Sequence, residues 1–217
     1  MKRLLITLLI LCVLIVGCGA VDNNSQASSV SNNTIEEVVE EKEERVVFTY
    51  DSKDYTLPIS YTDFVSLGEW EILDYSDKDG NATDEILESG EYIYAYLIDS
   101  LDTIVQCRIE NRNAFMTMSY QYCTVTDASF DMYLNIQTMP DNTLQLFDGL
   151  LYNGVSLEEV ENNKDKLVDY GFELQELNEV LYGLLPYEKE DSGWIYYTFT
   201  ISDNNEVRGI QAYYIDE

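Results

Sequence analysis

One alternating stretch, from Tyr92 to Ile98, constrains the fold of this chain more than any other feature. Tyrosine occupies every second position up to Tyr96, and Ile93 and Ala95 lie between the tyrosines. A period of two residues is typical of a β-strand, because successive side chains point to opposite faces of a sheet. Since both faces of this strand would carry apolar or aromatic side chains, we expect it in the centre of a sheet.

The segments that follow predict an antiparallel meander. A second strand would bury every second residue from Thr103 to Ile109. The polar run Asn111 to Asn113 predicts a hairpin loop, which leads into a third strand from Phe115 to Val125. Short polar loops between consecutive strands favour antiparallel pairing over a crossover helix. Further strands are expected at residues 46–50, 55–57, 69–75, 194–201 and 207–215.

Two capping patterns predict short helices. Ser60 with Asp63 places a hydroxyl where it can accept a hydrogen bond from the first turn of a helix, and Ser156 with Glu159 repeats the pattern. The segment 173–185 is consistent with a helix or with a loop. The resulting fold class is α+β, with antiparallel sheets and few short helices.

A weak internal repeat indicates how the folded part is divided. The sequence SGEYIY at 89–94 is similar to SGWIYY at 192–197, and a strand, a polar turn and another strand follow each copy. Two tandem αβ modules of similar plan would explain the repeat. We place their boundary at residue 139, with a strand-rich module at 46–138 and an αβ module at 139–217.

The N-terminus has the three parts of a secretory signal peptide. Lys2 and Arg3 are positive, Leu4 to Val16 is one apolar run, and small residues follow. The run is shorter than the roughly 20 residues that span a bilayer. The sequence IVGC at 15–18 resembles the bacterial lipobox, which implies cleavage after residue 17 and lipidation of the Cys18 sulfur.

Residues 1–17 would then be the signal peptide, and residues 18–45 a lipidated N-terminus with an acidic spacer. Two acyl chains are enough for stable anchoring. The expected location is therefore the outer face of the bacterial cytoplasmic membrane. As a flexible coil, residues 19–45 would reach roughly 30 Å from the anchor.

The whole arrangement resembles uncharacterised lipoproteins of Gram-positive bacteria. The C-terminal half, with NGVSLEEV at 153–160 before a terminal strand pair, is similar to modules of the β-lactamase-inhibitor-protein type and of small outer-membrane-assembly lipoproteins. The resemblance implies protein binding through sheet and loops, without chemistry. It transfers no functional residue to this chain.

Charge and one missing residue type exclude several functions. Without its signal peptide the chain has 10 basic and 41 acidic residues, a net charge of −31, which repels nucleic acid and anionic lipid head groups. There is no histidine, which removes Ser-His-Asp and Cys-His catalysis and imidazole zinc sites. We expect no enzyme activity, no cofactor and no metal site, although hydrolysis by paired carboxylates survives this exclusion.

Two local patterns have both a functional and a structural interpretation. The sequence DKDGN at 77–81 is similar to the centre of a calcium loop, but Tyr75 and Ile86 stand where that loop requires carboxylates, so a polar turn is favoured. Cys107 and Cys123 flank one predicted hairpin and would form either a disulfide or two buried thiols.

The 18 tyrosines could line a groove for a sugar or peptide, or simply occupy half-buried sheet positions, where tyrosine is favoured. An exposed cluster of Trp70, Trp194 and Tyr213 would indicate the groove. Together, these patterns predict a non-enzymatic, lipid-anchored module that binds a protein or another ligand at the cell envelope. The alternative is a lipoprotein that captures or hydrolyses glycans or peptides with carboxylates.

Lipidation makes a direct prediction about two cysteines. Cys18→Ala should abolish incorporation of labelled palmitate in intact cells, because the acylated sulfur is gone. Cys12→Ala should leave the label unchanged, because that residue leaves with the signal peptide. Palmitate retained by the Cys18→Ala protein would contradict the lipobox assignment.

Overall fold

The structure is a computed structural model that describes residues 46–77, 79–80, 85–131, 135, 139–186 and 193–216. All of these residues belong to one compact unit, residues 43–217. The expected signal peptide, the spacer and Cys18 lie outside the described residues. Within the described residues, no helix is long and apolar enough to cross a membrane.

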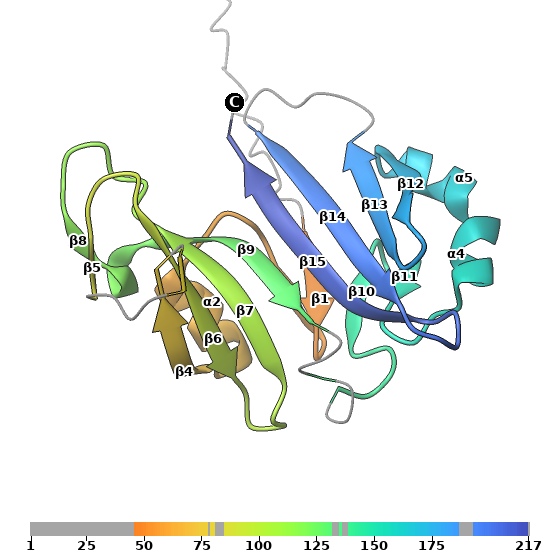
Figure 1. The fold of residues 1–217 in the computed structure, drawn as a ribbon, viewed down its shortest axis with the longest axis horizontal. Coiled ribbons are helices and arrows are strands. Elements are labelled where there is room, and N and C mark those ends of the chain that lie inside the picture. Colours follow the sequence, from red (N-terminus) through yellow and green to blue (C-terminus); the bar gives the residue numbers. More distant parts are fainter. Residues whose placement is uncertain are drawn as a thin grey trace, which may run out of the picture. The chain divides into compact units, whose positions relative to one another are not determined.

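A nine-stranded sheet, with antiparallel pairing throughout, dominates the fold (Figure 1). Eight strands follow one another across it, and a ninth short strand, β3, pairs beside β15 on the same edge of β9. The strands in spatial order are β12 (Phe172–Asn178), β13 (Leu181–Pro186), β14 (Trp194–Ile201), β15 (Val207–Ile215), β9 (Thr124–Phe130), β7 (Ile104–Glu110), β6 (Tyr92–Ile98) and β4 (Glu71–Ser76), with β3 at Ile59–Ser60.

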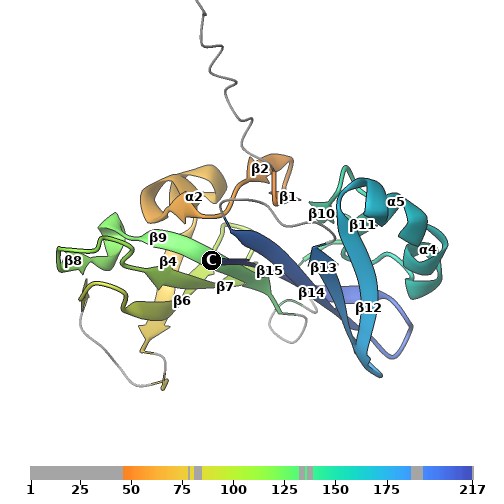
Figure 2. The same cartoon turned by 90° about the horizontal axis from the view of Figure 1, so that it is seen from above.

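Smaller elements pack on one face of this sheet. In Figure 2 helix α2 (Tyr61–Gly68) and a four-stranded sheet lie above it. That sheet has the order β11 (Leu151–Tyr152), β10 (Leu144–Leu146), β1 (Phe48–Tyr50) and β2 (Lys53–Tyr55). The remaining described elements are the pair β5 (Ile86–Leu87) and β8 (Met118–Ser119), a 3₁₀ turn at Tyr120–Tyr122, and helices α4 (Leu157–Asn162) and α5 (Lys164–Asp169).

The expected α+β class is wrong, because the fold is mainly β. The described residues contain three short α-helices beside the large sheet. The segment 173–185, for which helix or loop was expected, instead forms the hairpin of β12 and β13. Its residues have no strong strand preference, but pairing of β13 with β14 fixes an extended backbone, and tertiary context overrides propensity.

The nine-stranded sheet takes strands from both sides of the expected module boundary at residue 139. β15 pairs with β9 at four positions, from Ile210 opposite Phe130 to Tyr213 opposite Asp127. The expected modules 46–138 and 139–217 therefore share one sheet. The division into two modules at residue 139 stays a prediction.

An aromatic cluster joins the two sheets. The rings of Phe48 and Tyr50 lie 5.5 and 5.3 Å from the ring of Phe130, which projects from β9. Tyr50 also packs on Trp70 at 5.2 Å, and the Trp70 indole N–H donates to the Tyr55 hydroxyl at 3.1 Å. The buried indole N–H and hydroxyl thus satisfy each other, which avoids the cost of an unpaired polar group in the core.

Both predicted helix caps are confirmed. The Ser60 side chain accepts from the Asp63 N–H, and the Ser156 side chain accepts from the Glu159 N–H. The first helix ends at Gly68, where a side chain would collide with the Trp70 ring. Glycine at this position lets α2 approach the aromatic cluster closely.

The strand predictions had mixed outcomes. The alternating strand after Thr103 is confirmed, with Val105, Cys107 and Ile109 fully buried. The predicted continuous strand from Phe115 to Val125 is wrong, because the two-residue strand β8, a 3₁₀ turn and loop residues occupy most of that range, and β9 begins only at Thr124.

Two phenylalanines test which packing stabilises the fold. Phe130→Ala should lower the free energy of unfolding by about 3 to 5 kcal/mol, because it leaves a cavity between the two sheets. Phe115→Ala, at a side chain 95% exposed, should change it by less than about 0.5 kcal/mol. Urea unfolding measures both changes. If Phe130→Ala does not fold, Phe130→Leu is measured in its place and should show a smaller loss of unfolding free energy. Equal losses at the two sites would contradict this account of the core.

Candidate binding surface

No described element covers the face of the nine-stranded sheet opposite α2 and the four-stranded sheet (Figure 2). We call it the open face. The tyrosines of β6 lie on it, half-buried, while the apolar residues between them face the core. The tyrosine strand was expected at the centre with both faces covered. Instead β6 is next to the edge strand β4, and one face of it remains accessible.

A row of side chains crosses the open face on five neighbouring strands. The ladder registers place Tyr94 opposite Arg108, Arg108 opposite Asp127, Asp127 opposite Tyr213, and Tyr213 opposite Tyr196. We call these five residues the tyrosine row. Since neighbouring strands lie about 4.8 Å apart, the row spans roughly 20 Å.

A second row, one pleat along the strands, is polar throughout. It consists of Tyr96, Gln106, Ser129, Gln211 and Thr198. Its members hydrogen-bond to one another: the Gln106 amide donates to the Tyr96 hydroxyl at 2.9 Å, and the Thr198 hydroxyl is 3.3 Å from the Gln211 amide oxygen. The open face therefore offers hydroxyl, amide and carboxylate groups between aromatic rings.

Asp127 is the ionisable group at the centre of the tyrosine row. Burial raises the pKa of its carboxyl to about 6, although a hydrogen bond from Gln211 and the charge of Arg108 both act to lower the pKa. The Gln211 Nε2 atom donates to Oδ2 at 2.9 Å. Burial outweighs these two interactions, so the described residues only partly offset the cost of burying the negative charge of Asp127.

Arg108 is held by an aromatic ring and by a neighbouring acid. Its guanidinium carbon lies 4.0 Å from the centre of the Tyr92 ring, and Nη2 is 3.1 Å from Glu110 Oε2. Its Nε atom is buried without a hydrogen-bond partner among the described residues. The cation–π contact and the ion pair fix the orientation of the side chain.

The three tyrosines of the row are half-buried. The rings of Tyr196 and Tyr213 stack on each other at 5.4 Å with an angle of 13°, which occupies one ring face of each. Trp194 lies beside Tyr196 at 6.4 Å. Burial and the neighbouring Tyr196 and Asp127 raise the pKa of Tyr213, so its hydroxyl stays protonated and can donate.

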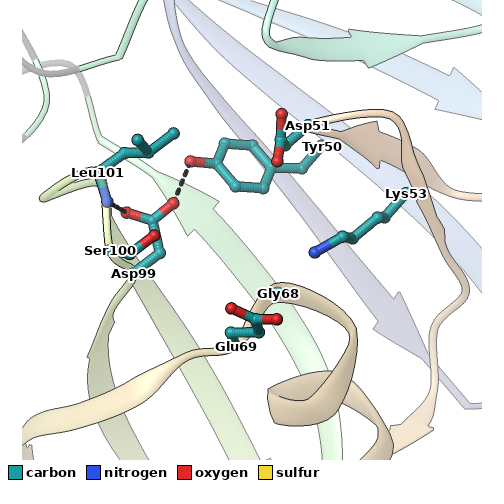
Figure 3. A pocket seen from close by; sticks show the side chains of 8 residues that line it. All are labelled: Tyr50, Asp51, Lys53, Gly68, Glu69, Asp99, Ser100 and Leu101. Atoms are coloured by element: carbon teal, nitrogen blue, oxygen red, sulfur yellow. Dashed lines mark hydrogen bonds between the residues drawn. The ribbon is translucent and has the colours of Figure 1, made fainter.

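One hollow of the described residues is small and lies away from the open face. It has a volume of about 70 Å³, room for a few water molecules. Figure 3 shows Tyr50 and Asp99 pointing toward each other across it, and the Tyr50 hydroxyl donates to the Asp99 carboxylate at 2.6 Å. A glycan or peptide does not fit this volume, so the cavity does not supply the deep acidic cleft that the hydrolytic alternative requires.

A second, shallower hollow of about 320 Å³ lies between the β10–β11 turn and the helices α4 and α5. Its size is at the lower limit for ligand pockets. Tyr170 donates to Asp148 at 2.9 Å, and Lys166 donates to Asn163 at 2.7 Å. Polar groups of this hollow thus already bind one another.

The residues singled out by sequence are dispersed. Trp70 is buried in the core, whereas Trp194 and Tyr213 lie on the open face, so these three residues do not form the exposed cluster that would indicate a groove. Cys107 and Cys123 are two buried, unpaired thiols, which decides between the alternatives left open above. Cys18 lies outside the described residues.

The calcium-like sequence forms a turn where it is described. The Asp77 carboxylate accepts from the Asp79 N–H at 2.9 Å, and residues 78 and 81 lie outside the described part. The described residues contain no cluster of three metal-ligating side chains.

Sequence reasoning missed Arg108 and Asp127. The alternation predicted from Thr103 to Ile109 leaves Arg108 on the water-facing side of its strand without a role, and Asp127 follows a strand predicted to end at Val125. The alternation itself could have identified both residues. Where charged residues of one strand share a face with the tyrosines of the neighbouring strand, that face is accessible to solvent.

Comparisons with protein families, with curated proteins and with solved structures found no match to this chain.

Asp127 makes stability depend on pH. Its pKa is about 6 in the folded protein and about 3.9 when unfolded, so the folded state binds the extra proton between these values. The free energy of unfolding should therefore fall by about 2 to 3 kcal/mol as pH rises from 4 to 6. Asp127→Asn should remove this fall and be the more stable protein at pH 7.5.

Urea unfolding at pH 4, 5, 6 and 7.5 measures the effect. Asp74→Asn, an exposed carboxyl on the edge strand β4, is the control and should keep the fall. Identical pH profiles for wild type and Asp127→Asn would refute the proposed environment of this carboxyl.

Proposed function

We propose that this protein is a non-enzymatic, lipid-anchored module of the bacterial envelope that binds another protein through the open face. The observation that carries the proposal is the tyrosine row, Tyr94–Arg108–Asp127–Tyr213–Tyr196, on a face that no described element covers. Covering such a face with a partner would bury aromatic rings and satisfy polar groups at once.

The composition of the open face supports protein binding. Tyrosine and arginine are enriched at protein interfaces. Tyrosine with small polar residues is also typical of antibody binding loops, because its side chain has only two rotatable bonds and loses little conformational entropy when its large ring is fixed. Here the rings are held by neighbours, as the stacked Tyr196 and Tyr213 show. A face that is already ordered loses less entropy on binding.

The size of the open face also fits a stable protein interface. Eight strands side by side span roughly 34 Å, and seven residues along a strand span roughly 23 Å. The product is on the order of 800 Å², the area that each partner contributes to a typical stable interface. The two hollows described above offer much less surface.

Charge favours a basic partner. The open face carries the acids Asp74, Glu110 and Asp127 against Arg108, and the whole chain has a net charge of −29. Such a field attracts cationic proteins, accelerates their encounter and repels acidic ones. A partner that presents lysine or arginine side chains is therefore expected.

The lipobox at Cys18 supports the location. Anchoring by lipid with a spacer of 27 residues would leave the folded unit on the outer face of the membrane, where it meets exported or surface proteins. This localisation rests on the sequence resemblance and is tested by palmitate labelling.

Paired substitutions test the open face. Tyr196→Ser with Tyr213→Ser should reduce recovery of cross-linked partner from intact cells at least tenfold, because the stacked pair would be lost from the interface. Tyr152→Ser with Tyr170→Ser removes two half-buried tyrosines away from the open face and should retain recovery. Quantitative mass spectrometry after affinity purification is the measurement, with circular dichroism to confirm folding.

Two outcomes would count against the proposal. One is that no protein exceeds the background of an untagged strain. The other is that both double variants recover the partner equally.

A further inference from the structure

The β5–β8 pair lies at one end of the structure (Figure 1), and four exposed apolar residues lie in this pair or within three residues of it in sequence. We call Ile86, Phe115, Met116 and Tyr122 the apolar tip. Phe115 is 95% and Tyr122 73% exposed, and Ile86 and Met116 are exposed by more than half. Single exposed apolar residues are ordinary on protein surfaces, but four that lie in or close to one strand pair indicate an interaction site.

A buried asparagine holds the loop of the apolar tip. Asn111 is fully buried, and its Nδ2 atom donates to the carbonyl oxygens of Leu87 at 2.9 Å and Met116 at 2.7 Å. Its backbone N–H donates to the Glu91 carbonyl, and its carbonyl accepts from the Gly90 N–H. One residue thus ties the loop to the segment that carries β5.

A second asparagine fixes the residues that are most exposed. The Asn113 Oδ1 atom accepts from the Phe115 N–H at 3.0 Å and from the Met116 N–H at 3.1 Å. The Asn113 N–H in turn donates to Asn111 Oδ1 at 3.0 Å. The backbone is therefore ordered while the Phe115 ring projects into solvent, which lowers the entropy cost when that ring becomes buried.

The apolar tip is also a local exception to the charge of the chain. Residues 111–126 contain no Asp or Glu and one Arg, Arg112, in a chain with 41 acidic residues. At physiological ionic strength charges interact over roughly 8 Å. Distant acids are therefore screened, and the charge within a few ångströms decides what the tip can approach. The nearest acids are Glu110 and Asp127, which border this segment in sequence, Asp216, whose carboxylate pairs with Arg112 at 2.5 Å, and Glu85 and Glu88, which flank β5.

We propose that the apolar tip inserts into the interfacial region of a lipid bilayer. The inference rests on the proposed lipid anchor: a spacer with a reach of roughly 30 Å holds the tip near the membrane at a millimolar effective concentration, so weak insertion suffices. Phe, Met and Ile suit the acyl boundary, and Tyr122 suits the head-group level. A pocket on a protein would also accept Phe115, but only the bilayer is within reach at all times.

Bilayer insertion can be measured without relying on lipidation in cells. The mature chain, residues 18–217, is coupled through Cys18 to maleimide lipid in vesicles. Cys107 and Cys123 are buried, so Cys18 is the reactive thiol. Phe115→Trp reports insertion through quenching by dibrominated phosphatidylcholine, after subtraction of the wild-type signal. Leu101→Trp, an exposed apolar site at the opposite end of β6 and β7, is the matched control.

We expect the added fluorescence of Phe115→Trp to be quenched at least twice as strongly as that of Leu101→Trp in zwitterionic vesicles. Phosphatidylglycerol should weaken the quenching at low salt, through Glu85 and Glu88, and 0.5 M salt should restore it. Equal quenching of both variants would overturn the inference, and so would quenching that requires phosphatidylglycerol.

Failure of this inference is distinguishable from failure of the proposed function. If Phe115→Trp is not quenched, while Phe115→Ala loses the cross-linked partner in cells, the tip is a protein contact, and partner binding stands. If palmitate labelling fails at Cys18, the anchor is wrong, whereas the vesicle result still reports whether the tip inserts.

Discussion

The packing of Phe48, Tyr50 and Trp70 against Phe130 is the interaction on which the rest of the structure depends. It buries one face of the nine-stranded sheet under α2 and the four-stranded sheet. Because side chains alternate along each strand, burying one set commits the other set to the opposite face. The tyrosines of β6, and Arg108 and Asp127 with them, reach solvent as a consequence of how the core is filled.

The strand register determines which side chains become neighbours on the open face. Asp127 lies opposite Arg108 and Tyr213 because β9 pairs with β7 on one side and with β15 on the other. A bulge between Asp127 and Val125 makes Thr126 the extra residue of β9, which adjusts the direction of the neighbouring side chains. A slip of one residue would place Asp127 in the core, where its charge would be far more costly.

Local patterns predicted local structure well. Ser60 and Ser156 cap helices as expected, because a hydroxyl three residues before a free backbone N–H satisfies it without help from the rest of the fold. The alternation after Thr103 identified a real strand and its buried face. The strand predicted to begin at Phe115 was wrong: an aromatic residue after a polar loop is typical of a strand, but Asn113 Oδ1 accepts from the N–H groups of Phe115 and Met116, and the buried Asn111 side chain donates to the Met116 carbonyl, so these residues form a loop.

By itself, the sequence determined which segments could be strands, where two helices begin, and that imidazole chemistry is absent. It also contains a segment that resembles a lipobox, and the lipid anchor stays a prediction from that resemblance. Only the tertiary structure decided that 173–185 joins the large sheet, that Trp70 is buried while Tyr213 is accessible, and that five side chains far apart in the chain form one row. The physical reason is that hydrogen-bond ladders between strands are non-local: pairing energy depends on which strands meet, and no single segment encodes its neighbour.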